Sequence, residues 1–148
     1  MDYVTSLELM MKDGVDSLWR TVRAMPDDKL DWRPEETART TRELLEEIVT
    51  TLPWNMDFVK TQKAPEWHDS STDKKMTLEE LEKTHRDYVT KFMAVVKEFP
   101  EKDLQKSNEL PWGKMTFFDV IMYPYWNMIY HWGQISYLQT MYGDKEMH

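Results

Sequence analysis

Asn127 and His131 are the two residues whose types and spacing most directly indicate a site in this sequence. They lie four positions apart, so on a helix they occupy one face, one turn from each other. That face continues as Val120 and Tyr123 before the pair and as Ile135 and Leu138 after it. An amide or an imidazole in such an apolar stripe costs about 1–3 kcal/mol unless it is hydrogen-bonded or binds something. The pair therefore predicts a polar site on a buried helix face.

The helix that must position this pair is predicted from about Thr116 to Tyr142. Thr116 and Asp119 have the spacing of a capping box, which marks a helix start. Gly143 is well placed to end the helix, because a glycine readily adopts the left-handed conformation of a C-terminal cap. This stretch is the longest apolar and aromatic run of the chain.

Three further helices are indicated by apolar residues at helical spacing. The first covers about residues 3–25, the second opens at a Thr40–Glu43 capping box, and the third runs from a Thr77–Glu80 capping box to Pro100. His85 falls on the apolar stripe of the third helix, where a lone histidine is expected to be a hydrogen-bonded core residue. Glu47 lies at the edge of the second helix's stripe, and its simplest interpretation is a solvated flank position.

The expected fold class is all-α, with residues 1–148 forming a single four-helix-bundle domain. No strand-like alternation or hairpin turn is evident. The connectors are about 14–16 residues long, which exceeds the usual loops between antiparallel bundle neighbours. At about 3.3 Å per residue, such a connector can run the full length of a helix of about 22 residues. A crossover connection is therefore allowed.

Composition narrows the function classes. A net charge of -8 argues against nucleic-acid binding, which needs a basic surface. The absence of cysteine excludes disulfides, zinc–thiolate sites and cysteine nucleophiles. No signal peptide or membrane-spanning segment is expected, since the apolar run also carries Asp119, Gln134 and Gln139. We therefore expect a cytoplasmic location.

Three stretches together resemble the DinB-like (DinB/YfiT-like) superfamily. They are LDWRPEETARTTRELLEEI (30–48), LPWGKMTFFDVI (110–121) and NMIYHWGQISYLQTMYG (127–143). Their order and separation carry the resemblance, which covers nearly the whole chain. It implies a four-helix bundle with a long crossover between helices two and three.

Many members of that superfamily bind one divalent metal through three histidines. The resemblance places Glu47, Asn127 and His131 at these positions, so that only His131 keeps the family residue. It also implies that Glu47 lies beside the other two. Carboxylate and imidazole are ordinary metal ligands, but an amide oxygen binds zinc poorly, so affinity should be weaker than with three histidines. The trio could instead satisfy itself as a polar network without metal.

Two functions stay open. Relatives with a metal are associated with low-molecular-weight thiol cofactors, so the resemblance implies a thiol-dependent S-transferase with a degenerate metal site. The alternative is a non-catalytic, small-ligand-binding or stress-associated helical protein on the same scaffold. In either case the partner is a small molecule, and no nucleic acid or membrane is expected.

A homodimer is also expected, because the last helix is apolar nearly all round. A second stripe lies beside the one that holds His131, and a bundle helix normally buries one side. Connectors such as the one around Trp112 are the alternative cover for this stripe, which consists of Phe117, Ile121, Met128 and Trp132. We expect the aromatic residues near the site to serve packing rather than to form a ligand cage: Trp54, Tyr123, Trp126, Tyr130 and Trp132.

Overall fold

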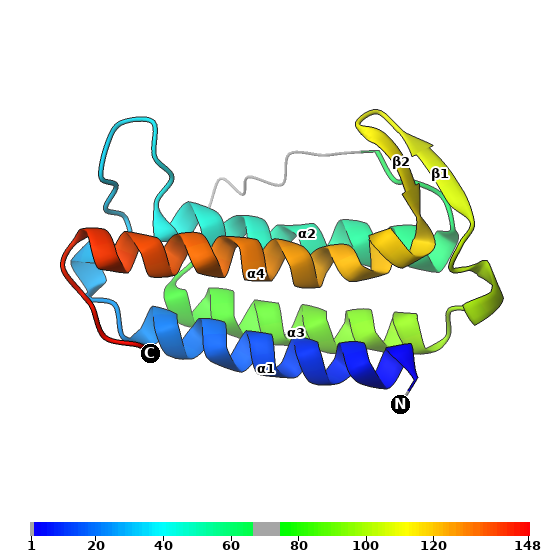
Figure 1. Cartoon of the computed structure of the whole chain (residues 1–148), viewed down its shortest axis with the longest axis horizontal. Helices are drawn as coiled ribbons and strands as arrows, with labels where there is room; N and C mark the ends of the chain where they lie inside the picture. Colours follow the sequence, from blue (N-terminus) through cyan, green and yellow to red (C-terminus); the bar gives the residue numbers. More distant parts are fainter. Residues whose placement is uncertain (1, 67–74) are drawn as a thin grey trace.

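The computed structural model describes residues 2–66 and 75–148, and four long α-helices form its body (Figure 1). This confirms the expected four-helix bundle. Two short 3₁₀ turns, η1 (Asp27–Lys29) and η2 (Glu101–Asp103), precede α2 and follow α3. The four helices are α1 (Tyr3–Arg23), α2 (Thr41–Thr61), α3 (Leu78–Lys97) and α4 (Phe117–Met141).

Three helices begin at the capping boxes predicted from the sequence. In each, the threonine side chain accepts a hydrogen bond from the backbone N–H three residues on, and an acidic side chain accepts one from the threonine N–H. The helix starts are therefore encoded locally. The pairs are Thr40–Glu43, Thr77–Glu80 and Thr116–Asp119.

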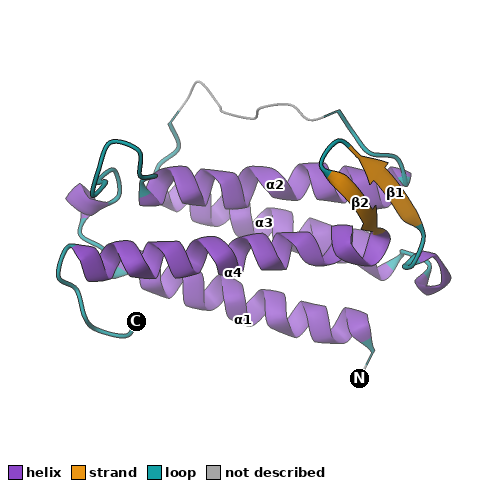
Figure 2. Ribbon diagram, turned by 45° about the horizontal axis from the view of Figure 1, so that its top comes forward, coloured by secondary structure: helices purple, strands orange, loops and turns teal. Residues whose placement is uncertain are grey.

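The helices α1 and α4 run in one direction along the bundle, and α2 and α3 run in the other (Figure 1). Because α2 and α3 are parallel, the connector of residues 62–77 has to return along the bundle. This is the crossover that was predicted; the middle of that connector lies outside the described residues. The packed pairs are α2 with α3, α2 with α4, α1 with α4, and α1 with α3 (Figure 2). Thus α1 lies diagonally from α2, and α3 lies diagonally from α4.

The core fills the space between the four helices and includes a polar pair. Leu18, Trp19 and Phe92 are fully buried. His85 of α3 is 1% exposed and accepts a hydrogen bond from the Trp19 indole nitrogen at 2.9 Å. The prediction that His85 is a hydrogen-bonded core residue is therefore confirmed.

Gly14 of α1 lies against the Met128 side chain of α4. A Cβ at this position of α1 would collide with the end of the Met128 side chain of α4. A glycine inside a helix costs about 1 kcal/mol relative to alanine. Here the missing side chain leaves room for the end of the Met128 side chain between α1 and α4.

The expectation of no strands is wrong at one place. Ser107–Leu110 (β1) and Gly113–Thr116 (β2) form a two-stranded antiparallel hairpin before α4. Gly113 follows the two-residue turn at φ +133°, a conformation that glycine tolerates. Strands of four residues are too short for their alternation to be recognised in the sequence. The Lys106 and Leu104 carbonyls next to the hairpin accept the first N–H groups of α4, at 3.1 and 2.9 Å.

The reason given for a homodimer is also wrong, although the dimer itself stays a prediction. The second stripe of α4 is covered by its own chain: Phe117, Ile121 and Met128 are buried. The half-buried Trp132 donates a hydrogen bond to the Thr21 hydroxyl of α1 at 3.0 Å. Trp112 of the connector packs against Trp54 of α2, at a ring distance of 5.8 Å.

Three of the aromatic residues expected to serve packing face solvent instead. The exposed fractions of Tyr123, Trp126 and Tyr130 are 39%, 45% and 65%.

Within the described residues, no helix is both long and apolar enough to span a membrane.

Candidate functional site

The antiparallel contact between α2 and α4 brings Glu47, Asn127 and His131 together. The His131 Nε2 atom lies 2.9 Å from Glu47 Oε1. The Asn127 amide nitrogen donates to the same oxygen at 3.3 Å. One carboxylate oxygen thus joins all three residues, which are separated by 80 and 84 positions along the chain.

Gln134, one turn after His131, fixes the other side of the imidazole ring. Its Oε1 atom lies 2.6 Å from His131 Nδ1. Since an ionised carboxylate only accepts hydrogen bonds, His131 Nε2 carries a proton when it faces Glu47. Gln134 can accept from Nδ1–H through its oxygen or donate to a bare Nδ1 through its nitrogen. Gln134 and Glu47 therefore hold the imidazole ring from both sides.

Arg39 completes the site, and sequence analysis did not identify it. It lies just before α2, and its guanidinium forms an ion pair with Glu47 Oε2. The same guanidinium donates to the Glu43 carbonyl at 2.8 Å. Burial raises the pKa of Glu47, but hydrogen bonds from His131 and Arg39 outweigh it, so that the pKa lies below its usual value.

The depth of the site differs from the expected interior position. The side chain of His131 is 5% exposed, whereas that of Glu47 is 38% exposed. The site therefore lies at the boundary between the core and the surface. Glu47 is neither the solvated flank residue of the simplest interpretation nor a buried group.

One polar atom of the site has no partner. Asn127 is 7% exposed, and its Oδ1 atom is buried without a hydrogen bond. An unpaired buried carbonyl oxygen costs about 1–3 kcal/mol. A bound donor, such as a water molecule or a ligand group, would remove this cost.

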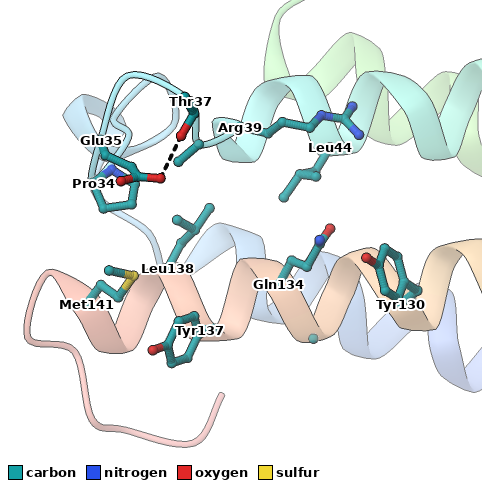
Figure 3. A pocket seen from close by; sticks show the side chains of 12 residues that line it. Pro34, Glu35, Thr37, Arg39, Leu44, Tyr130, Gln134, Tyr137, Leu138 and Met141 are labelled. Atoms are coloured by element: carbon teal, nitrogen blue, oxygen red, sulfur yellow. Dashed lines mark hydrogen bonds between the residues drawn. The ribbon is translucent and has the colours of Figure 1, made fainter.

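A groove of about 790 Å³ adjoins the site (Figure 3). It lies between the second half of α4 and the segment that leads into α2. Leu44 of α2 and Leu138 and Gln134 of α4 point into the space between the two helices (Figure 3). The lining is mainly apolar and aromatic, and it consists of Pro34, Glu35, Thr37, Ala38, Arg39, Leu44, Tyr130, Gly133, Gln134, Tyr137, Leu138 and Met141.

The groove and the polar site share two side chains. Arg39 and Gln134 line the groove, and they are also the residues that hold Glu47 and His131. Any molecule in the groove would therefore contact the residues that control the carboxylate and the imidazole.

A family model that describes the DinB family matches residues 9–147. The chain belongs to the DinB family. The family resemblance drawn from the three sequence stretches is thereby confirmed.

Solved structures of DinB-like proteins share this fold. A DinB-like protein from Bacillus subtilis is 18% identical, with a TM-score of 0.68 over 99% of this chain and 96% of that one. A DinB-like protein from Bacillus cereus is 20% identical, with a TM-score of 0.66 over 88% and 86%. A DinB family member from Shewanella denitrificans is 17% identical, with a TM-score of 0.55 over 97% and 85%. The comparison with curated proteins finds no match.

The residues of this DinB family protein fit a tight transition-metal centre poorly. The Arg39 guanidinium occupies one oxygen of Glu47 and places a positive charge beside the position that a cation would take. The other oxygen faces the imidazole and the amide nitrogen, rather than a space between three donors. Among the described residues, no group of three or more His, Cys, Asp or Glu side chains could hold a metal ion.

The sequence did contain a signal for the two residues that were missed. Gln134 lies three positions after His131, which places it on the same helix face. Arg39 directly precedes the Thr40 cap, so its side chain lies beside the first turns of α2. No rule of spacing, however, shows which acidic residue an arginine in a loop will contact.

Proposed function

We propose that this DinB family protein binds a small amphipathic organic molecule in the groove between α4 and the segment before α2, without needing a metal. The observation that carries the proposal is the shared use of Arg39 and Gln134 by the groove and by the Glu47–His131 site. Small-molecule sites typically combine an apolar lining with a few polar groups that orient the ligand.

The lining indicates the chemistry of the ligand. Tyr130, Tyr137 and Leu138 offer aromatic and aliphatic surface for an apolar, ring-containing part. Arg39 is purely a donor, and Gln134 can donate through its amide nitrogen. The polar end of the ligand is therefore an acceptor, such as a carbonyl, carboxylate or sulfonate group.

The fluorescent probe 8-anilinonaphthalene-1-sulfonate has this chemistry and tests the proposal. We expect it to bind the native protein with chelator present. Tyr137→Ala and Tyr130→Ala should each weaken binding about tenfold, because losing one aromatic contact of about 1.5 kcal/mol has that effect. Fluorescence titration measures both dissociation constants.

The matched control is Tyr123→Ala, which removes an exposed tyrosine from the same helix but outside the groove. It should leave the dissociation constant of the probe unchanged. Equal losses for Tyr123→Ala and Tyr137→Ala would show that the probe binds the outer surface of α4, and the proposal would then fail.

A second function, the thiol-dependent transferase implied by the family, is favoured by one observation. The unpaired Asn127 Oδ1 atom lies beside Glu47 and His131, and an amide oxygen suits a weakly held hard cation. A divalent cation there would stabilise a thiolate at neutral pH. The residues themselves would supply one carboxylate oxygen, one imidazole nitrogen and one amide oxygen.

Metal analysis separates the two functions. We expect protein purified without nickel resin to contain no stoichiometric zinc or nickel, because Arg39 competes for Glu47 and the site has only one histidine, His131. Elemental analysis before and after dialysis against chelator measures this. Stoichiometric zinc that survives the chelator would favour the transferase over metal-free binding.

A further inference from the structure

The groove between α4 and the segment before α2 carries a second charged group, Glu35. Figure 3 shows Glu35 at the end of the groove near Met141, whereas Arg39 and Gln134 lie toward Tyr130. A carboxylate therefore lines one end of the groove, and a guanidinium and an amide line the other.

The carboxylate of Glu35 is held in place but keeps open acceptor positions. The Thr37 hydroxyl donates to Glu35 Oε1 at 2.6 Å (Figure 3). A carboxylate has about four lone-pair sites, so this single hydrogen bond leaves most of them open. Within the described part of the chain, no Lys, Arg or His side chain forms an ion pair with Glu35.

The positive charges nearest to Glu35 in the chain are engaged elsewhere. Arg39 lines the groove, but its guanidinium pairs with Glu47 and donates to the Glu43 carbonyl at 2.8 Å. Arg33 pairs with the Glu43 carboxylate at 3.0 Å. The negative charge of Glu35 is thus left for a cation from outside the described chain.

The wall of the groove suits an organic cation better than a metal ion. Tyr137 and Met141 line it from α4, and their exposed fractions are 66% and 48%. A tyrosine ring attracts an ammonium group to its face, and a methionine thioether packs readily against alkyl groups. The net charge of -8 also draws cations toward the protein.

We propose that the ligand of this groove is bifunctional, with an ammonium group at Glu35 and a hydrogen-bond acceptor at Arg39 and Gln134. Leu44 and Leu138 lie between the two ends and would cover the apolar part that joins these groups (Figure 3). The inference rests on the proposed binding of an organic molecule in the groove, and it names the class of that molecule. The class is an organic amine with a carbonyl, carboxylate or sulfonyl group at its far end.

A matched pair of fluorescent compounds tests the proposal. N-(5-aminopentyl)dansylamide has an aromatic ring, a sulfonyl acceptor and a terminal ammonium group, and N-pentyldansylamide lacks only the terminal amino group. We expect the native protein to bind the ammonium compound about fivefold more tightly at low salt. An exposed ion pair and a cation–π contact each contribute modestly, which together gives an effect of this size. Fluorescence titration of the full chain with chelator present measures both dissociation constants.

Glu35→Gln tests the assignment of the ammonium group to this carboxylate. It keeps the shape of the side chain and removes the charge, so the ratio of the two dissociation constants should fall to about one. The matched control is Glu36→Gln, which removes the same charge from the next residue, outside the groove lining. This control should keep the fivefold preference. Raising the salt concentration should weaken the preference of the native protein, because salt screens an exposed ion pair.

Each other outcome would overturn the proposal. Equal dissociation constants of the two compounds for the native protein would show that the groove does not select an ammonium group. Equal losses in Glu35→Gln and Glu36→Gln would mean that the compound responds only to the overall negative charge. In both cases, binding of 8-anilinonaphthalene-1-sulfonate would show that the proposed function still holds. If neither this probe nor the two dansylamides bind, the proposed function fails as well.

Discussion

Lowering the pH from 7 to 5 is expected to reduce the free energy of unfolding by about 2 kcal/mol through His85 alone, with the loss reaching about 3 kcal/mol at pH 4. Burial, with the nearby Arg86 charge, lowers the pKa of His85 from 6.5 to about 4. Between these values the unfolded chain binds a proton that the folded protein does not. Stability is therefore highest above pH 6.5 and falls as the pH drops towards 4. Urea unfolding at a series of pH values measures the change.

His85→Gln is the matched variant for this experiment, because the glutamine oxygen can accept the Trp19 indole hydrogen bond without titrating. It should remove most of the loss between pH 7 and 5. This window lies above the ordinary pKa values of the carboxylates, several of which are lowered further, so their contribution is lost only at more acidic pH. A variant with the same pH dependence as the wild type would contradict the assignment to His85.

Replacing Glu47 with leucine is expected to destabilise the protein by about 2 kcal/mol at pH 7. It leaves the imidazole of His131 and the amide of Asn127 without their common acceptor. The double variant Glu47→Leu/His131→Phe should cost less than the sum of the two single changes. With chelator present, we expect a coupling energy of about 1 kcal/mol between Glu47 and His131. The value is small because solvent screens the partly exposed Glu47. Chemical denaturation of the wild type, the two single variants and the double variant measures the four free energies of unfolding.

Arg39 changes what this cycle should show. It still compensates the Glu47 carboxylate when His131 is replaced, so His131→Phe should be milder than Glu47→Leu. The control cycle uses Glu46→Leu with His131→Phe, since Glu46 is the neighbouring half-buried residue of α2. In this control cycle, the destabilising effects of the two single changes should add up to that of the double variant. Additive effects in the Glu47 cycle as well would mean that Glu47 and His131 do not interact.

The helices could be predicted because their signals are local. Each capping box joins residues three apart, and each apolar stripe repeats over many turns, as with Thr40 and Glu43 at the start of α2. The hairpin was missed because each strand has only four residues, too few for a period-two pattern to stand out in the sequence. Its Gly113 is the only local sign, and a single glycine is weak evidence for a strand turn.

The site could be predicted only in part, for a related reason. The spacing of Asn127 and His131 shows that they share a face, but their contact with Glu47 came from family resemblance. Contacts across 80 or more residues depend on how whole helices pack. The exposure of Tyr123, Trp126 and Tyr130 was hidden similarly, since an aromatic residue that faces solvent and one that faces the core have the same letter in the sequence.

The diagonal placement of α1 and α2 has a consequence for how the protein folds. These two helices are made first, but neither packs mainly on the other: α1 lies against α3 and α4, and so does α2. The first half of the chain therefore has no helical partner of its own on which to bury its apolar faces. The core closes only when α4 has been synthesised and packs between α1 and α2, so folding must await the synthesis of α4. Helix α4 thus completes both the core and the candidate site.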